Sequence, residues 1–106
     1  MVTMTPIVIA RAVETCGGCP AQWDAWTTDG QYLYLRYRWG VGTVDAEPSP
    51  DIDTWTENHQ VAEFDTGDGL GFIELAEFCR LAGLTLADGF EHVAYAQYVE
   101  QEMRRP

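Results

Sequence analysis

Two cysteines near the N-terminus, Cys16 and Cys19, have the spacing of a metal or redox pair. A redox pair needs a thiol with a lowered pKa, usually from the N-terminus of a following helix, and here Pro20 and strand-like sequence follow instead. A structural zinc site needs two further ligands. The candidates for these occur singly along the chain: Cys79, His59 and His92. The sequence therefore favours a turn around two glycines with no metal or cofactor, and zinc at Cys16 and Cys19 is the alternative.

An acidic and glycine-rich run from Asp65 to Phe78 resembles an EF-hand loop entering its second helix. The matching pieces are Asp68-Gly69, Ile73 and Glu77-Phe78. Three residues separate Gly69 from Ile73, whereas the calcium loop has a single residue there. This spacing favours an ordinary strand-to-helix turn, where the helix dipole stabilises nearby acids.

Groupings typical of catalysis are missing from the sequence. His59 and His92 have no nucleophile or carboxylate at a recognisable spacing, and Ser49, the only serine, lies between two prolines. Glu74 and Glu77 share one face of a predicted helix, as solvated carboxylates commonly do. No glycine loop with a lysine could hold a phosphate, because the chain has no lysine. The sequence therefore predicts a protein that is not an enzyme.

The strand pattern is clearest in a hairpin around Thr28-Asp29-Gly30. The predicted strands are residues 6–14, 21–27, 31–39, 40–44 and 61–65, with a long loop over 45–58. A two-residue loop at Asp29-Gly30 would aim Asp24 into the apolar face. A three-residue loop with a left-handed Gly30 keeps Asp24 in water, so we expect Trp23 opposite Leu35.

This register gives the hairpin two different faces. The inward set is Trp23, Ala25, Leu33, Leu35, Tyr37 and Trp39, and the outward set is Gln22, Asp24, Trp26, Tyr32, Tyr34, Arg36 and Arg38. Tryptophan, tyrosine and arginine are enriched at interface hot spots. The outward face is therefore predicted to bind a partner, and the alternative is that helices or another strand cover it. The candidate partner-binding residues are Trp26, Tyr32, Tyr34, Arg36, Arg38, Asp45, Glu47, Asp51, Asp53 and Trp55.

Two helices are predicted at the C-terminal end. The first spans residues 72–82 and ends at Gly83. The second spans residues 86–103, with Thr85 and Asp88 spaced like a capping box. Its expected buried stripe is Phe90, Val93, Ala94 and Tyr98. The pair looks a little like a helix-turn-helix, but its second helix carries Asp88 and Glu91 where a DNA-reading helix needs cations, so packing is the favoured role.

Charge narrows the possible partners. The 106-residue chain has 17 acids, six basic residues that are all arginines, a net charge of -11 and a pI of about 4.2. Residues 45–68 contain eight of the acids and no arginine or lysine. Such a charge disfavours direct nucleic-acid binding and favours a basic protein partner.

Length and hydropathy place the chain in one domain, residues 1–106. The sequence has no long apolar run and no basic leader, so we expect neither a membrane span nor a signal peptide. Three cysteines are too few for a disulfide scaffold, which favours the cytoplasm.

The run from Cys19 to Gly40 resembles small uncharacterised proteins encoded by actinobacteria and their bacteriophages. A weaker resemblance covers the run from Ile73 to Gly83. The resemblance implies a genomic setting and no particular chemistry. A phage origin would favour a small accessory protein that acts on a host protein.

These observations predict an α+β fold, with an antiparallel sheet of four or five strands backed on one face by two C-terminal helices. The predicted function is an acidic cytoplasmic interaction module that engages a protein, with no membrane partner. The alternatives are a nucleic-acid mimic that blocks a basic groove on a host enzyme and a small zinc-binding protein.

Overall fold

The computed structural model describes residues 6–17, 21–56 and 59–103. The described strands are β1 (Val8–Gly17), β2 (Ala21–Thr27), β3 (Tyr32–Arg38), β4 (Val41–Glu47), β5 (Gln60–Asp65) and β6 (Thr85–Val93). The helices are the short 3-10 helix η1 (Ile52–Thr54), α1 (Leu75–Ala82) and α2 (Tyr95–Met103). The fold is α+β, as the sequence predicts.

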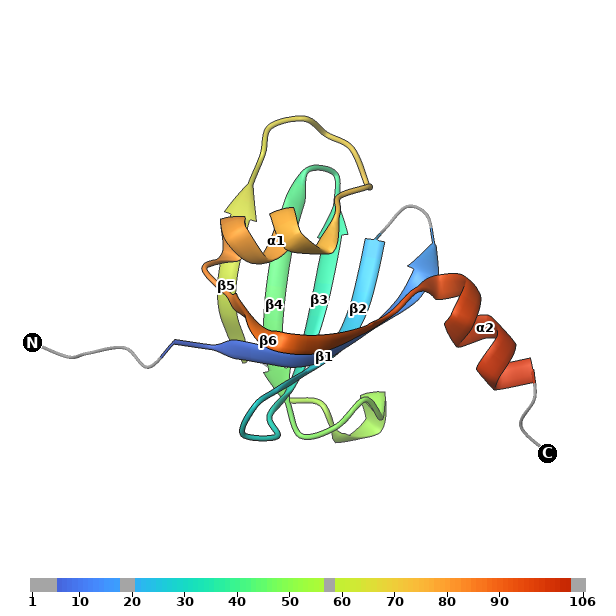
Figure 1. The fold of residues 1–106 in the computed structure, drawn as a ribbon. Coiled ribbons are helices and arrows are strands. Elements are labelled where there is room, and N and C mark those ends of the chain that lie inside the picture. Colours follow the sequence, from blue (N-terminus) through green and yellow to red (C-terminus); the bar gives the residue numbers. More distant parts are fainter. Residues whose placement is uncertain (1–5, 18–20, 57–58, 104–106) are drawn as a thin grey trace, which may run out of the picture.

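The strands form one six-stranded sheet in the order β5-β4-β3-β2-β1-β6. Neighbours are antiparallel except β1 and β6, which are parallel. The sheet curls, so that β1 and β6 cross in front of β3 and β4, and α1 lies on that same inner side (Figure 1). Helix α2 packs against β1 and extends beyond the end of the sheet.

The hairpin of β2 and β3 adopts the predicted register. Trp23 lies opposite Leu35, and Asp24 lies opposite Tyr34. The loop has three residues, closed by a hydrogen bond from the Thr27 amide to the Gln31 carbonyl, and Gly30 has a φ of 89°. Glycine reaches this left-handed region without a steric penalty, so the turn chemistry sets the register.

The core lies between the inner face of the sheet and α1. Trp23 packs against Phe78 of α1 with ring centroids 5.7 Å apart, and Phe64 meets Phe78 edge-on at 5.0 Å. Gly42 leaves room for the Phe64 ring, since a Cβ atom there would come within 2.2 Å of Cε1 of that ring. The small residue on β4 therefore allows the aromatic layer to close.

Trp39 is a correction to the sequence analysis. It was expected on the inward face at the end of a strand, yet β3 ends at Arg38 and Trp39 is 64% exposed. Trp39 and Gly40 form the two-residue turn between β3 and β4, both with positive φ, 55° and 78°. The right-handed twist of paired strands favours this turn type, and it rotates Trp39 out of the core.

The predicted second helix is wrong over the first half of its length, and the expected strand count is wrong as well. Residues 85–93 form β6, which pairs with β1, and only Tyr95–Met103 is helical. Gly89 has a φ of 71° and lies where the β1–β6 pairing shifts register. The free edge of β1 offers backbone partners to residues 85–93, and Gly89 weakens the competing helix by about 1 kcal/mol relative to alanine.

Both helices begin later than expected. Helix α1 starts at Leu75, leaving Phe72 62% exposed, and ends at Gly83 as predicted. The first amide of α2, at Tyr95, donates to the carboxylate of Glu14 on β1 at 2.9 Å. A tertiary contact therefore caps this helix in place of the predicted Thr85 and Asp88 box.

Candidate interaction surface

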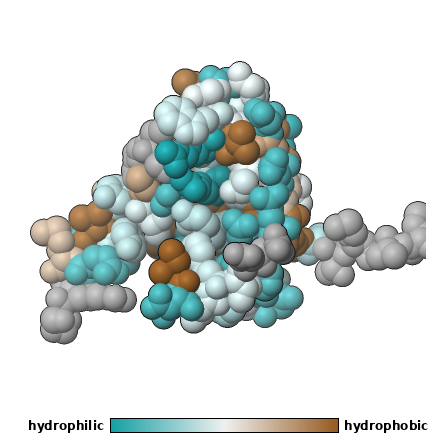
Figure 2. Space-filling model, turned by 180° about the vertical axis from the view of Figure 1, so that it is seen from behind, coloured by the Kyte–Doolittle hydropathy of each residue, from teal (hydrophilic) through white to brown (hydrophobic). Residues whose placement is uncertain are grey.

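The face of β2, β3 and β4 that points away from α1 is termed the outer face. It carries Gln22, Asp24 and Trp26 from β2, Tyr32, Tyr34, Arg36 and Arg38 from β3, and Val41, Thr43, Asp45 and Glu47 from β4. In the described part of the chain, α1 packs on the inner side and α2 packs mainly against β1. Figure 2 shows this side, where the most hydrophilic groups gather near the centre of the upper half.

Four aromatic rings cover one end of the outer face. Tyr32 lies between Trp26 and Trp55, with ring centroids 5.7 and 6.3 Å away, and the ring of Tyr34 is tilted against Trp55 with centroids 4.9 Å apart. The guanidinium of Arg11 lies 5.4 Å from the Trp26 ring centroid. Tyr32 is only 2% exposed, so this ring is structural and cannot contact a partner.

The segment from Pro48 to Thr56, here the acidic loop, is folded against this aromatic end. The Trp55 indole donates to the Ser49 carbonyl at 2.8 Å, and the Thr56 amide donates to the Glu47 carboxylate at 3.0 Å. Glu47 is 4% exposed, and His59 Nδ1 lies 3.6 Å from its Oε1. Glu47 therefore anchors the loop, which corrects its assignment as a partner contact.

The acids around the aromatic rings differ in exposure. Burial raises the pKa of Asp24, while the Tyr32 hydroxyl, which donates to its carboxylate at 2.5 Å, lowers that pKa to a smaller extent. Burial also raises the pKa of Asp45, and the charge of Glu47 adds to the effect. Asp51 and Asp53 are exposed on the acidic loop. Of the described acids around these rings, Asp51 and Asp53 are the two that present solvated negative charge.

The other end of the outer face is a shallow pocket of about 350 Å³, here the arginine pocket. It is lined by Arg36, Arg38, Trp39, Val41 and Thr43. Nε of Arg36 is buried and has no hydrogen-bond partner among the described residues. The guanidinium of Arg38 lies 5.7 Å from the Trp39 ring centroid. The pocket thus joins two cations, a hydroxyl and an exposed indole.

These two arginines differ from the other described ones. Arg11 pairs with Glu91 at 2.7 Å, and Arg80 pairs with Glu77. Neither Arg36 nor Arg38 has an ion pair in the part of the chain that the structure describes. Unpaired arginines in so acidic a protein mark a place where positive charge faces solvent.

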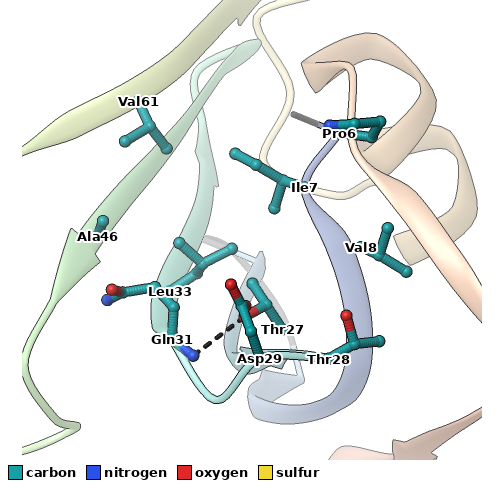
Figure 3. A pocket seen from close by; sticks show the side chains of 10 residues that line it. All are labelled: Pro6, Ile7, Val8, Thr27, Thr28, Asp29, Gln31, Leu33, Ala46 and Val61. Carbon is teal, nitrogen blue, oxygen red and sulfur yellow. Dashed lines mark hydrogen bonds between the residues drawn. The ribbon is translucent and has the colours of Figure 1, made fainter. Parts of the chain in front are cut away.

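A second pocket, of about 540 Å³, opens on the inner side where α1 does not reach. It is lined by Pro6, Ile7, Val8, Thr27, Thr28, Asp29, Gln31, Leu33, Ala46 and Val61. Figure 3 shows Ile7, Leu33 and Val61 around a common space, with the backbone amide of Gln31 donating to the Thr27 hydroxyl. The side chains of Thr27 and Gln31 form hydrogen bonds within the protein, and Ile7, Val8, Leu33, Ala46 and Val61 supply its apolar lining.

The structure therefore separates the predicted site residues. Trp26, Tyr34 and Trp55 are half-buried, Tyr32 and Glu47 are buried, and Asp51 and Asp53 are exposed. The sequence analysis missed Trp39 and Thr43. A Trp-Gly pair between two β-rich runs is the signal that could have placed Trp39 in a turn. Asp45 belongs to β4, and the expected loop begins only after Glu47.

Cysteine chemistry involves two described thiols. Cys16 lies at the end of β1, and Cys79 is buried in the core, where burial raises the pKa of the thiol to about 11. Cys19 lies outside the described residues, so the zinc hypothesis stays a prediction. Within residues 6–17, 21–56 and 59–103 no three side chains of the metal-ligating types are grouped to hold an ion.

No protein-family model matches the chain, and neither a curated protein nor a solved structure matches it. Among the described residues, no helix is both long and apolar enough to cross a membrane.

Proposed function

We propose that this protein is a non-enzymatic interaction module that binds another protein through the outer face of its sheet. The observation that supports it most strongly is that neither α1 nor α2 packs on this face, while Trp26, Tyr34, Arg38 and Trp39 lie there at least partly exposed. A folded protein normally exposes few large aromatic side chains close together on one surface. Tryptophan, tyrosine and arginine supply most of the binding energy at interface hot spots.

The charge distribution defines the partner. Asp51 and Asp53 project from the acidic loop, and the chain carries a net charge of -11. A basic surface beside an aromatic-binding patch complements this arrangement, and long-range attraction would speed its association. In keeping with the resemblance, we propose a cytoplasmic accessory protein of an actinobacterial or bacteriophage system that acts on a host protein.

A nucleic-acid mimic is a weaker second candidate. A mimic needs acids in a continuous stripe that copies the phosphate spacing. On the outer face, Arg36 and Arg38 interrupt the acids, and Glu47 is withdrawn into the structure. A protein partner with both a basic and an apolar part fits this pattern better.

Quantitative capture from an actinobacterial extract, followed by binding of the purified candidate, tests the proposal. We expect a partner that binds the wild type and loses at least about tenfold in affinity with Trp26→Ala, because truncating an interface anchor typically costs this much. Val61→Ala, in the inner pocket, is the matched control and should bind as the wild type does. Equal binding by Trp26→Ala, or a loss confined to Val61→Ala, would contradict the assignment of the outer face.

A further inference from the structure

The arginine pocket contains positive charge that the protein itself does not use. Nε of Arg36 is buried and has no hydrogen-bond partner among the residues that the structure describes, and leaving a charged donor unpaired in this way is costly. Arg38 lies on the same face two residues later, across from Val41, and Thr43 lies across from Arg36. Arg36, Arg38 and Thr43 therefore line the same pocket of about 350 Å³.

Nearby acids do not neutralise these arginines. Glu63 lies opposite Thr43 and Asp65 opposite Val41 on the adjoining strand β5. Glu63 accepts a hydrogen bond from the Gln60 side chain at 3.0 Å, and Asp65 accepts one from the Gly67 amide at 2.8 Å. Both carboxylates accept hydrogen bonds from these other donors, and their negative charge still lies beside the pocket.

The turn beside the pocket adds an apolar wall. Trp39 has a φ of 55°, a conformation that bulky residues rarely adopt, and its ring is 64% exposed. A conformation of this kind persists only where the surrounding structure imposes it, and such residues cluster at ligand sites. Here the two-residue turn places the indole beside Arg38, where a ligand could contact both.

We propose that the arginine pocket binds a carboxylate group attached to an apolar moiety. The two Nη groups of a guanidinium match the two oxygens of a carboxylate as a fork, and both Arg36 and Arg38 line the pocket. Trp39 and Val41 would contact the apolar part. A singly charged ligand is preferred to a phosphate dianion, because Glu63 and Asp65 repel the second charge. The pocket volume suits a ligand of this size.

The carboxylate could belong to a small carboxylic acid or to a polypeptide. Binding at the arginine pocket does not depend on the proposed protein partner of the outer face. Three probes separate them: benzoate, the peptide acetyl-Gly-Gly-Leu with a free C-terminus or with an amidated one, and inorganic phosphate. Binding is followed in the full-length protein by the NMR signals of the arginine Nε–H groups, with the Arg36 signal assigned by its loss in Arg36→Lys.

We expect saturable shifts of the Arg36 and Arg38 signals with benzoate or with the free-acid peptide. Preference for benzoate identifies a small acid, and preference for the peptide identifies a chain carboxylate. Arg36→Lys keeps the charge and loses the fork, so it should weaken binding about tenfold, as expected for a lost charge-assisted hydrogen bond. Arg80→Lys, at the arginine paired with Glu77, is the matched control and should bind unchanged.

Three results would overturn the proposal. They are no saturable shift with either carboxylate, tighter binding of phosphate or of the amidated peptide, and undiminished binding by Arg36→Lys. Thermal unfolding of Arg36→Lys close to that of the wild type ensures that weaker binding reflects the pocket and not a loss of fold.

Discussion

The two faces of the β2–β3 hairpin have similar aromatic content and opposite roles. On the inner face, Trp23 and Tyr37 are at most 1% exposed and pack with Phe64 and Phe78. On the outer face, Trp26 and Tyr34 remain half-buried beside charged groups. The difference shows that residue type alone does not separate core from binding surface. What packs over a side chain decides it, and α1 packs on only one side.

The largest expected effect distinguishes the two tryptophans of β2. Trp23→Ala should lower the free energy of unfolding by about 3–5 kcal/mol, because it removes a fully buried ring. Trp26→Ala removes one ring contact and the contact with Arg11, which together amount to about 1–2 kcal/mol. Urea denaturation measures both values. Similar losses for the two variants would contradict the contrast between the faces.

A substitution at Gly42 tests the inner face by adding volume to the core, whereas Trp23→Ala removes volume. Gly42→Ala should destabilise the protein by about 1–3 kcal/mol, because the new methyl group overlaps the Phe64 ring and forces repacking. Phe64→Leu in the same chain should recover part of that loss, and a double-mutant cycle by chemical denaturation measures the coupling. Additive losses would mean that the two residues do not compete for the same space.

A substitution at Asp24 tests how burial affects a charged group at the aromatic end of the outer face. Burial raises its pKa, so the folded state disfavours the charged form, and this cost is present above the folded-state pKa. The cost disappears as the pH falls below about 3.9, where the carboxyl is protonated even in the unfolded chain. Asp24→Asn should therefore stabilise the protein at pH 7, with the gain vanishing in acid.

Unfolding curves at several pH values measure this gain. The amide oxygen of Asn can still accept the Tyr32 hydroxyl, so the hydrogen bond is retained. Asp53→Asn, on the exposed acidic loop, is the control and should change stability little at any pH. A loss of stability at pH 7 in Asp24→Asn would indicate that the charged hydrogen bond outweighs burial.

The smallest expected effect on stability comes from Asp51→Asn with Asp53→Asn. Exposed charges contribute little, and Asn accepts a hydrogen bond at the Asp51 cap as well as Asp does, so the change should stay below about 0.5 kcal/mol. Association with a basic partner should nevertheless slow, and its salt dependence should flatten. Stopped-flow association rates at several salt concentrations measure this. Unchanged rates would limit the partner contact to the aromatic and arginine groups.

Glu47 is kept out of that variant for a structural reason. Its sequence neighbours suggest one acidic stretch, yet its carboxylate is 4% exposed and accepts the Thr56 amide. Removing it would release the acidic loop and confuse folding with binding. Position in the sequence could not distinguish the buried Glu47 from the exposed Asp51, because their difference in exposure depends on how the acidic loop folds back against β4.

The features that the sequence predicts correctly depend on residues close to one another in the chain. The hairpin register follows from a glycine turn and from alternation, since one slipped register would bury Asp24. The end of α1 follows from Gly83, which adopts the left-handed conformation that terminates helices. Part of the candidate site follows from alternation, because Arg36 and Arg38 alternate along β3 and Trp26 lies on the same face from β2. The Trp-Gly pair at residues 39 and 40 is a local turn signal, but the position of Trp39 beside Arg38 depends on the fold.

The sequence by itself determined the α+β class, the hairpin with its two faces and the excess of acid, because these depend on composition and on spacing within a few residues. Only the tertiary structure decided that residues 85–93 form a strand, since the free edge of β1 supplies their hydrogen-bond partners from about 80 positions away. It also decided that Glu14 caps α2, that Trp55 covers Tyr32, and that Nε of Arg36 has no hydrogen-bond partner in the described part of the chain. Each of these depends on contacts between segments remote in sequence, whose geometry no local pattern records.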